Sequence, residues 1–196
     1  MRRALVLCLF LAACGGGGSD GEGAKLCGKS SIRGEKVGRV SAAAYGCGVR
    51  NAVAVRYVAG VRLSSPATLD CTTAKALEKW VRRTVKSTIG SRGGGVRELQ
   101  VYGSYSCRPR NNVAGAKISE HGRGKAIDIG GFRLADGTTI SVLSDWDRGR
   151  DGRILNRLHR AACGTFGTVL GPESDRYHAN HFHLDTAKHG NGAYCR

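Results

Sequence analysis

Four of the six histidines in this chain lie in two short segments, one of which also carries a carboxylate. His178, His181 and His183 lie within six residues near the C-terminus, and His121 lies shortly before Asp128. Imidazole nitrogens and carboxylate oxygens together form a ligand set that zinc accepts. The clustering therefore predicts a metal site, and this mixture of residue types is typical of a catalytic one.

Alternation along β-strands predicts how these side chains meet. Residues two apart on a strand share a face, so His181, His183 and Asp185 should point the same way. If the strand that carries Asp128 is a neighbour, Asp128 and His183 face a common cleft, and the loop before that strand delivers His121. Two histidines and one carboxylate leave a fourth zinc position for water, which is the arrangement of a hydrolytic site.

Nearby polar residues are candidates to support such a site. Asp185 and Ser119 are expected to contact the metal ligands from outside and to orient them. A hydrolytic zinc also needs a base, and His181 is the best placed candidate because it shares a strand face with His183. His178 would assist by orienting His181 or the water.

Other acids and histidines are assigned less central roles. Glu120 and Glu173 are alternative bases, although a salt bridge with an arginine is the preferred interpretation of Glu120. The two histidines that lack such neighbours are interpreted as surface residues: His159 and His189.

The N-terminus predicts export and lipid attachment. Residues 1–13 combine a positive start, Met1-Arg2-Arg3, with a short apolar stretch, which is typical of a signal peptide. Leu11-Ala12-Ala13-Cys14 is similar to a bacterial lipobox, with cleavage before Cys14 and a lipid on its sulfur; an ordinary secretory signal with an incidental cysteine is the alternative. Residues 14–26 are glycine-rich and are predicted to form a flexible linker. Gly15 is not an obvious inner-membrane retention residue, which favours the outer membrane, with the protein on the periplasmic side.

The other cysteines predict a disulfide framework. Of the eight cysteines, Cys8 leaves with the signal and Cys14 takes the lipid, so six, an even number, remain to pair in an exported chain. No C-x-x-C pair is present, which argues against a cysteine zinc site. Three bridges are expected, with 15 pairings left open, among the following residues: Cys27, Cys47, Cys71, Cys107, Cys163 and Cys195.

The net charge of the chain indicates which classes of partner it could bind. The formal net charge of +16 falls to +14 once Arg2 and Arg3 leave with the signal. So basic a chain usually suggests nucleic acid, but an exported, disulfide-bonded protein meets little of it, and none is expected. Anionic envelope polymers or lipid headgroups are one interpretation of the charge, and a plain solvated surface is the other. The roughly 170 residues after the linker suit one domain with its own core, and we expect a monomer.

Hydrophobic periodicity predicts the elements that position the site. Apolar residues at helical spacing predict a helix over Thr72–Ile89, capped by Asp70 or Thr72 and closed by Gly90, with Trp80 in the core. A second helix carries Ile154, Leu155, Leu158 and Ala162, and residues 134–142 form a hairpin turning at Asp136-Gly137. Strands are predicted at residues 53–58, 61–63, 96–102, 126–132, 166–170 and 181–185. The mixture predicts an α+β fold with a small antiparallel sheet flanked by helices and stapled by disulfides.

Two segments match known motifs. The string S-x-H-x-x-G-x-A-x-D resembles the first zinc motif of the D-Ala-D-Ala carboxypeptidase and dipeptidase clan, and it is matched by Ser119, His121, Gly124, Ala126 and Asp128. The H-x-x-H-x-H motif of the clan's murein endopeptidase branch is matched by His178, His181 and His183. This resemblance implies zinc as the cofactor, His121, Asp128 and His183 as its ligands, and His181 as the catalytic base.

Most of the chain is more closely similar to the extensin-like C-terminal domain family, and we assign residues 27–196 to such a domain. The similarity rests on several short segments: Gly103-Ser104-Tyr105-Ser106-Cys107-Arg108, Ser119-Glu120-His121, Phe132, Leu134-Ala135-Asp136-Gly137, Val169-Leu170-Gly171-Pro172 and His181-Phe182-His183-Leu184-Asp185. Arg108 resembles the arginine that the related clan places near the substrate carbonyl. It would stabilise oxyanion charge or bind a terminal carboxylate; a structural arginine beside a disulfide is the alternative.

The expected function is hydrolysis of D-amino-acid peptide bonds in peptidoglycan by a lipid-anchored zinc carboxypeptidase or endopeptidase, acting on stem peptides. The alternative from another class is a non-catalytic cell-wall binding module with the same fold. Among enzymatic functions, the alternative is a metallopeptidase that acts on other envelope proteins. The complete set of His121, Asp128 and His183 favours an enzyme, because a pure binder need not keep an open zinc site.

Overall fold

The computed structural model describes residues 23–42 and 46–196. The predicted signal peptide, the lipidation site at Cys14 and most of the predicted linker lie outside the described residues. The end of that linker is instead the first strand of the sheet, β1 (Ala24–Leu26), and Leu26 is buried in the core. The assignment of residues 24–26 to a flexible linker was therefore wrong. Within the described part of the chain, no helix is both long and apolar enough to cross a membrane.

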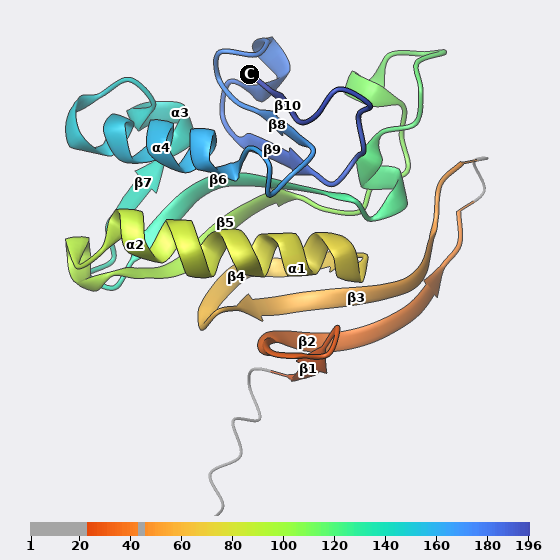
Figure 1. The fold of residues 1–196 in the computed structure, drawn as a ribbon, viewed down its shortest axis with the longest axis horizontal. Helices are drawn as coiled ribbons and strands as arrows, with labels where there is room; N and C mark the ends of the chain where they lie inside the picture. The colour runs from red at the N-terminus through yellow and green to blue at the C-terminus, as the bar shows by residue number, and fades with distance from the viewer. Residues whose placement is uncertain (1–22, 43–45) are drawn as a thin grey trace, which may run out of the picture.

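One mixed sheet of ten strands organises the described residues (Figure 1). The strand order is β1-β2-β3-β4-β5-β6-β9-β8-β10, and β7 pairs with β6 off this path. The remaining strands are β2 (Lys29–Val40), β3 (Val49–Val58), β4 (Val61–Leu69), β5 (Val96–Gly103), β6 (Ala126–Leu134), β7 (Thr139–Ser141), β8 (Thr168–Leu170), β9 (Phe182–Asp185) and β10 (Tyr194–Cys195). The pairs β4–β5 and β8–β10 are parallel, and the other pairs are antiparallel.

The predicted fold class, a small antiparallel sheet flanked by helices, was wrong. The sheet is large and mixed, and the helices are few. The longest strand that was not predicted from the sequence is β2, with twelve residues. Its outer half carries exposed polar and charged residues and therefore lacks the regular apolar alternation that identifies a strand. The parallel pairing of β4 with β5 follows from the helical segment between them, which returns the chain to the same end of the sheet.

The predicted helix over Thr72–Ile89 is confirmed as one continuous helical segment. It consists of α1 (Cys71–Trp80), the π-helical turn η1 (Val81–Val85) and α2 (Lys86–Ile89). Asp70 caps its start, because its side chain accepts a hydrogen bond from the Thr73 amide at 2.7 Å. The second predicted helix is α4 (Gly149–Ala162), preceded by the short α3 (Val142–Asp145). The hairpin between β6 and β7 turns at Asp136-Gly137 as predicted.

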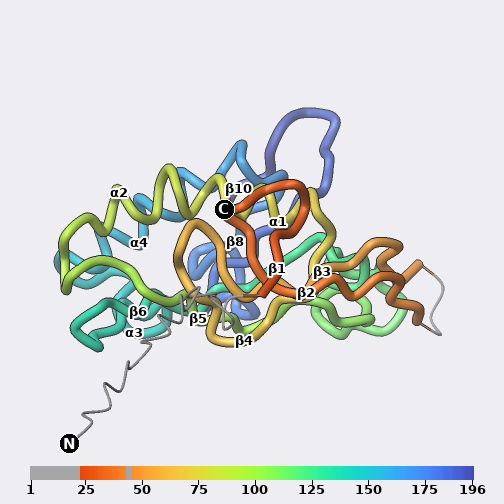
Figure 2. Tube along the Cα trace, turned by 90° about the horizontal axis from the view of Figure 1, so that it is seen from below, coloured from red at the N-terminus to blue at the C-terminus, as the bar shows by residue number. Residues whose placement is uncertain are grey.

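The helices α1, α2 and α4 lie together along one side of the sheet (Figures 1 and 2). Trp80 fills the space between helix and sheet, with its ring centroid 6.1 Å from Phe132 and 6.3 Å from Phe166. Its indole nitrogen donates to the Leu158 carbonyl at 3.2 Å, which ties α1 to α4. The core therefore lies between the helices and one face of the sheet, and the other face is left for a site.

We expect Trp80→Ala to lower the free energy of unfolding by about 3–5 kcal/mol, because it leaves a large cavity at the junction of both helices and the sheet. Leu143→Ala, at a side chain that is 66% exposed, is the control and should change stability by less than about 0.5 kcal/mol. Urea denaturation of residues 23–196, with the disulfides intact, measures both. A loss below about 1 kcal/mol for Trp80→Ala would contradict this assignment of the core.

The interpretation of His159 as a surface residue was wrong. It is buried on α4, with its ring centroid 5.5 Å from Trp146 and 5.1 Å from Phe182. Its position four residues after Leu155 places it on the inner face of the helix. Burial lowers the pKa of this imidazole, which favours the neutral form in the core.

Three disulfides link the six cysteines of the described residues. Cys27–Cys71 joins the start of the sheet to the start of α1, and Cys47–Cys107 joins two loops beside the candidate site. Cys163–Cys195 ties the C-terminal strand β10 to the end of α4.

Candidate metal centre

The strands β6 and β9 place two candidate ligands side by side. Their antiparallel register sets Asp128 directly opposite His183 and Ala126 opposite Asp185. Because Ile127 and Phe182 belong to the core under the helices, Asp128 and His183 point to the opposite face of the sheet. The strand-face prediction for these two residues is confirmed.

A short helical turn, η4 (Glu120–Arg123), delivers the third candidate ligand. Ser119 starts this turn, since its hydroxyl accepts from the His121 amide at 3.4 Å. Gly124 ends it with a φ of 66°, and a Cβ there would lie 2.7 Å from a Val49 methyl carbon. The turn is therefore held close against the sheet, with the His121 side chain over β6.

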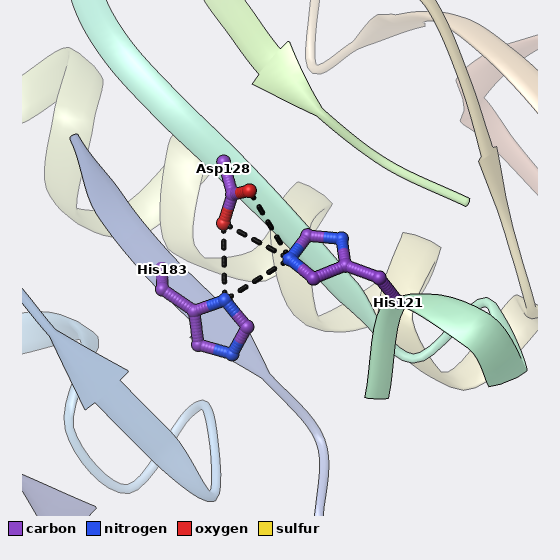
Figure 3. A group of neighbouring side chains, drawn as sticks. All are labelled: His121, Asp128 and His183. Atoms are coloured by element: carbon purple, nitrogen blue, oxygen red, sulfur yellow. Dashed lines mark hydrogen bonds and ion pairs between the residues drawn. The ribbon is translucent and has the colours of Figure 1, made fainter. Parts of the chain in front are cut away.

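The three side chains converge on one point (Figure 3). His121 Nε2 lies 3.1 Å from Asp128 Oδ1 and 3.1 Å from His183 Nδ1, and His183 Nδ1 lies 3.0 Å from Asp128 Oδ1. All three residues are buried. The structure thus brings together the predicted ligand set of His121, Asp128 and His183.

The far nitrogen of each imidazole is already bonded. His121 Nδ1 donates to the Ser104 carbonyl, and His183 Nε2 donates to Asp185 Oδ2 at 3.0 Å. These contacts leave the lone pairs of His121 Nε2 and His183 Nδ1 facing the Asp128 carboxylate. Three acceptors aimed at one point in a buried site are stabilised by a positive charge between them, either a proton or a metal ion, and the donor set fits a metal ion.

The pKa values of the cluster agree with a cation-binding role. Burial raises the pKa of Asp128, but hydrogen bonds and charge interactions with His121 and His183 outweigh it and hold the pKa well below its usual range. Burial lowers the pKa of His183, but its bonds to Asp128 and Asp185 outweigh this effect and raise the pKa to about 9. Without a metal, a proton on His183 therefore supplies the positive charge at neutral pH, and a bound metal would replace it.

His181 lies next to the cluster, just before β9, with its Nε2 3.6 Å from Asp128 Oδ1. Its Nδ1 donates to the Asn180 side-chain oxygen at 2.8 Å, which directs Nε2 toward the cluster. Burial lowers the pKa of His181, and nearby histidines add to this effect against the opposing charge of Asp128. A neutral imidazole with a free Nε2 can accept a proton.

His178 is buried beside His181, with ring centroids 5.3 Å apart. Its Nδ1 donates to Asp175 Oδ1 at 2.8 Å, and the same oxygen accepts from the Tyr177 amide at 2.8 Å. Sequence reasoning missed Asp175. An acid three residues before a histidine of the cluster was the available signal, because such an acid can cap the turn that carries the histidine.

A cleft with a volume of about 400 Å³ opens over the cluster. Arg108 and Arg110 lie on its wall, and the half-exposed rings of Tyr177 and Tyr194 contribute to its lining. His189 is exposed, as predicted, but it also lines the cleft and contacts the Thr168 hydroxyl at 2.9 Å.

The two alternative bases are less well placed. Glu120 lines the cleft, but it forms a salt bridge with Arg123 at 3.1 Å, as the preferred interpretation expected. Glu173 is exposed and is not among the residues of the cleft.

Fold and site together define a disulfide-bonded mixed-sheet domain with a buried His–Asp–His cluster at the base of a cleft. The chain belongs to the family described as Extensin-like protein C-terminus, whose model matches residues 25–196. No curated protein and no solved structure is significantly similar to the chain.

Proposed function

We propose that the protein is a zinc metallopeptidase that hydrolyses D-amino-acid peptide bonds of peptidoglycan. The observation that carries the proposal is the convergence of His121 Nε2, Asp128 and His183 Nδ1, with both far imidazole nitrogens already bonded. Nitrogen and oxygen atoms about 3 Å apart suit one zinc ion with ligand distances of about 2.0–2.2 Å. The resemblance of both histidine motifs to the D-Ala-D-Ala carboxypeptidase clan supports zinc and this substrate class.

The residues of the cleft have separate roles in the proposed reaction. When bound, zinc supplies Lewis acidity, which lowers the pKa of water and polarises a carbonyl. His181 Nε2 accepts the proton of the attacking water and returns it to the leaving amine. His178, fixed by Asp175, keeps the His181 ring in place, and Arg108 binds the scissile carbonyl oxygen or a terminal carboxylate.

The setting of the reaction follows from the N-terminal sequence. A signal peptide and a lipid on Cys14 would place the domain at the periplasmic side of a bacterial membrane, beside the peptidoglycan. Three disulfides in the described residues suit this oxidising compartment. We expect the domain to act there as a monomer.

Digestion of purified peptidoglycan tests the proposal. Zinc-loaded residues 23–196 should release peptides whose masses identify the bond cleaved. A chelator should abolish the release, and added zinc should restore it. If the zinc-loaded protein cleaves no muropeptide of any length but sediments with peptidoglycan, the binding module replaces the enzyme.

Asp185→Asn should weaken zinc binding by about 10–100-fold, because a neutral amide holds the His183 ring less firmly than a carboxylate. Titration with a competing chromophoric chelator measures the affinity. Asp147→Asn, at an exposed acid before α4, is the control with the same charge change. Equal affinities in both variants would contradict an orienting role for Asp185.

A further inference from the structure

The face of the molecule opposite the cleft is strongly basic. On α4, the exposed arginines Arg150, Arg153, Arg157 and Arg160 recur at spacings of three and four and so form one stripe. Along α1, η1 and α2, the exposed residues Lys75, Lys79, Arg83 and Lys86 form a second stripe at the same spacing. We call these eight residues the basic helical face.

The two stripes lie on adjacent helices on one side of the sheet (Figure 2). Thr88 of α2 lines the same shallow groove as three residues of the α4 stripe: Arg150, Arg153 and Arg157. The indole of Trp80 bonds to the Leu158 carbonyl and fixes the spacing of the helices. The eight cations are therefore carried by helices whose relative position is fixed.

Acidic residues do not neutralise this face. The fully described helices α1, α2 and α4 carry two acids, Glu78 and Asp151. Glu78 is buried and bonds to Arg82 at 2.8 Å, outside the two stripes, and Asp151 bonds to Arg92 at 2.6 Å. Two exposed acids lie near α4: Asp147, in the loop before it, and Glu173, whose charge acts on His159 of the same helix.

The face also lacks apolar anchors. The large exposed hydrophobic side chains of the described residues are not on the helices that carry the two stripes: Val37, Tyr102, Val113, Leu143, Tyr177 and Tyr194. A partner would thus be held by charge at the surface, without insertion of side chains into an apolar phase.

We propose that the basic helical face docks on the anionic headgroups of a phospholipid bilayer. A layer of headgroups offers charge to both stripes at once, and Cys14, the predicted lipid attachment point, lies nine residues before Gly23, a span of at most about 30 Å. Docking in this way turns the cleft, on the other face of the sheet, away from the membrane. The inference depends on the charge distribution and not on the proposed peptidase activity.

Vesicle sedimentation with unlipidated residues 23–196, which contain the described sheet and all three disulfides, tests the docking. The protein should bind vesicles of phosphatidylcholine mixed with phosphatidylglycerol, should not bind phosphatidylcholine alone, and should dissociate in high salt. Each cation near an anionic surface contributes about fivefold to binding. Neutralising Lys79, Arg83, Arg153 and Arg157 to glutamine should therefore weaken binding by at least about 100-fold.

The control removes the same charge at exposed residues that lie off the helices, by changing Lys36, Arg39, Arg133 and Lys188 to glutamine. It should weaken binding by less than about fivefold. An equal loss in both variants would overturn the proposal, because net charge alone would then account for binding. Wild type that binds peptidoglycan but no anionic vesicle would also overturn it, in favour of a polymeric partner. Hydrolysis of soluble muropeptides tests the peptidase separately and should be the same in both variants and the wild type.

Discussion

The His183→Ala variant is expected to lose both bound zinc and peptidoglycan hydrolysis. His183 Nδ1 is one of three atoms that converge at the centre, and two remaining ligands hold zinc poorly. Zinc affinity should fall by more than the roughly 10–100-fold expected for Asp185→Asn, because Asp185 only orients a ligand whereas His183 is one. Hydrolysis should fall to the uncatalysed background, because polarisation of the carbonyl and activation of water are lost together. Metal analysis after gel filtration and mass spectrometry of muropeptides measure the two effects.

The control for this variant is His189→Ala, which removes an exposed histidine from the wall of the same cleft. It should keep stoichiometric zinc. His183→Ala also leaves the buried carboxylates of Asp128 and Asp185 without their shared partner, so circular dichroism must show that it is folded. A folded His183→Ala protein with undiminished zinc would remove His183 from the ligand set.

The pairing of Asp128 with His183 could be predicted because it depends on local rules. The period of two along a strand assigns each residue to a face, and the apolar neighbours identify which face is the core. Phe182 and Leu184 mark the inner face of β9, so His183 had to lie on the outer one. His121 was predicted from its place in the loop before β6 and from the motif, but the path of that loop has no periodic signal, so its contacts could not be derived in the same way.

The overall sheet could not be predicted from the same rules. Alternation identifies strands with one buried face, whereas the outer half of β2 is exposed and lacks this signal. The helix predicted between β4 and β5 was the available signal that these strands run parallel, because a helical crossover returns the chain to the same end of the sheet. Of the contacts beyond the ligands, Asp185 could be predicted from its strand face, whereas the Ser104 carbonyl could not, because it is a backbone group that any residue would supply. The burial of His159 could have been predicted, because it lies four residues after Leu155 on the same helix. It was predicted to be a surface residue because it has no ligand-like neighbours in the sequence.

The His181→Ala variant separates the proposed base from the ligands. It should retain stoichiometric zinc and lose about 10²–10⁴-fold in the rate of hydrolysis, which is the usual contribution of a positioned acid–base group. The physical reason is that His181 Nε2 lies beside the cluster, 3.6 Å from Asp128 Oδ1, while the converging set is complete without it. His178→Ala removes the imidazole that packs against the His181 ring but keeps the proposed base itself, so it is the comparison variant and should lose less activity. Zinc content and turnover of a defined muropeptide are measured on the same preparations. If His181→Ala loses zinc to the same degree as His183→Ala, then His181 is a fourth ligand, and the proton must be accepted elsewhere in the cleft.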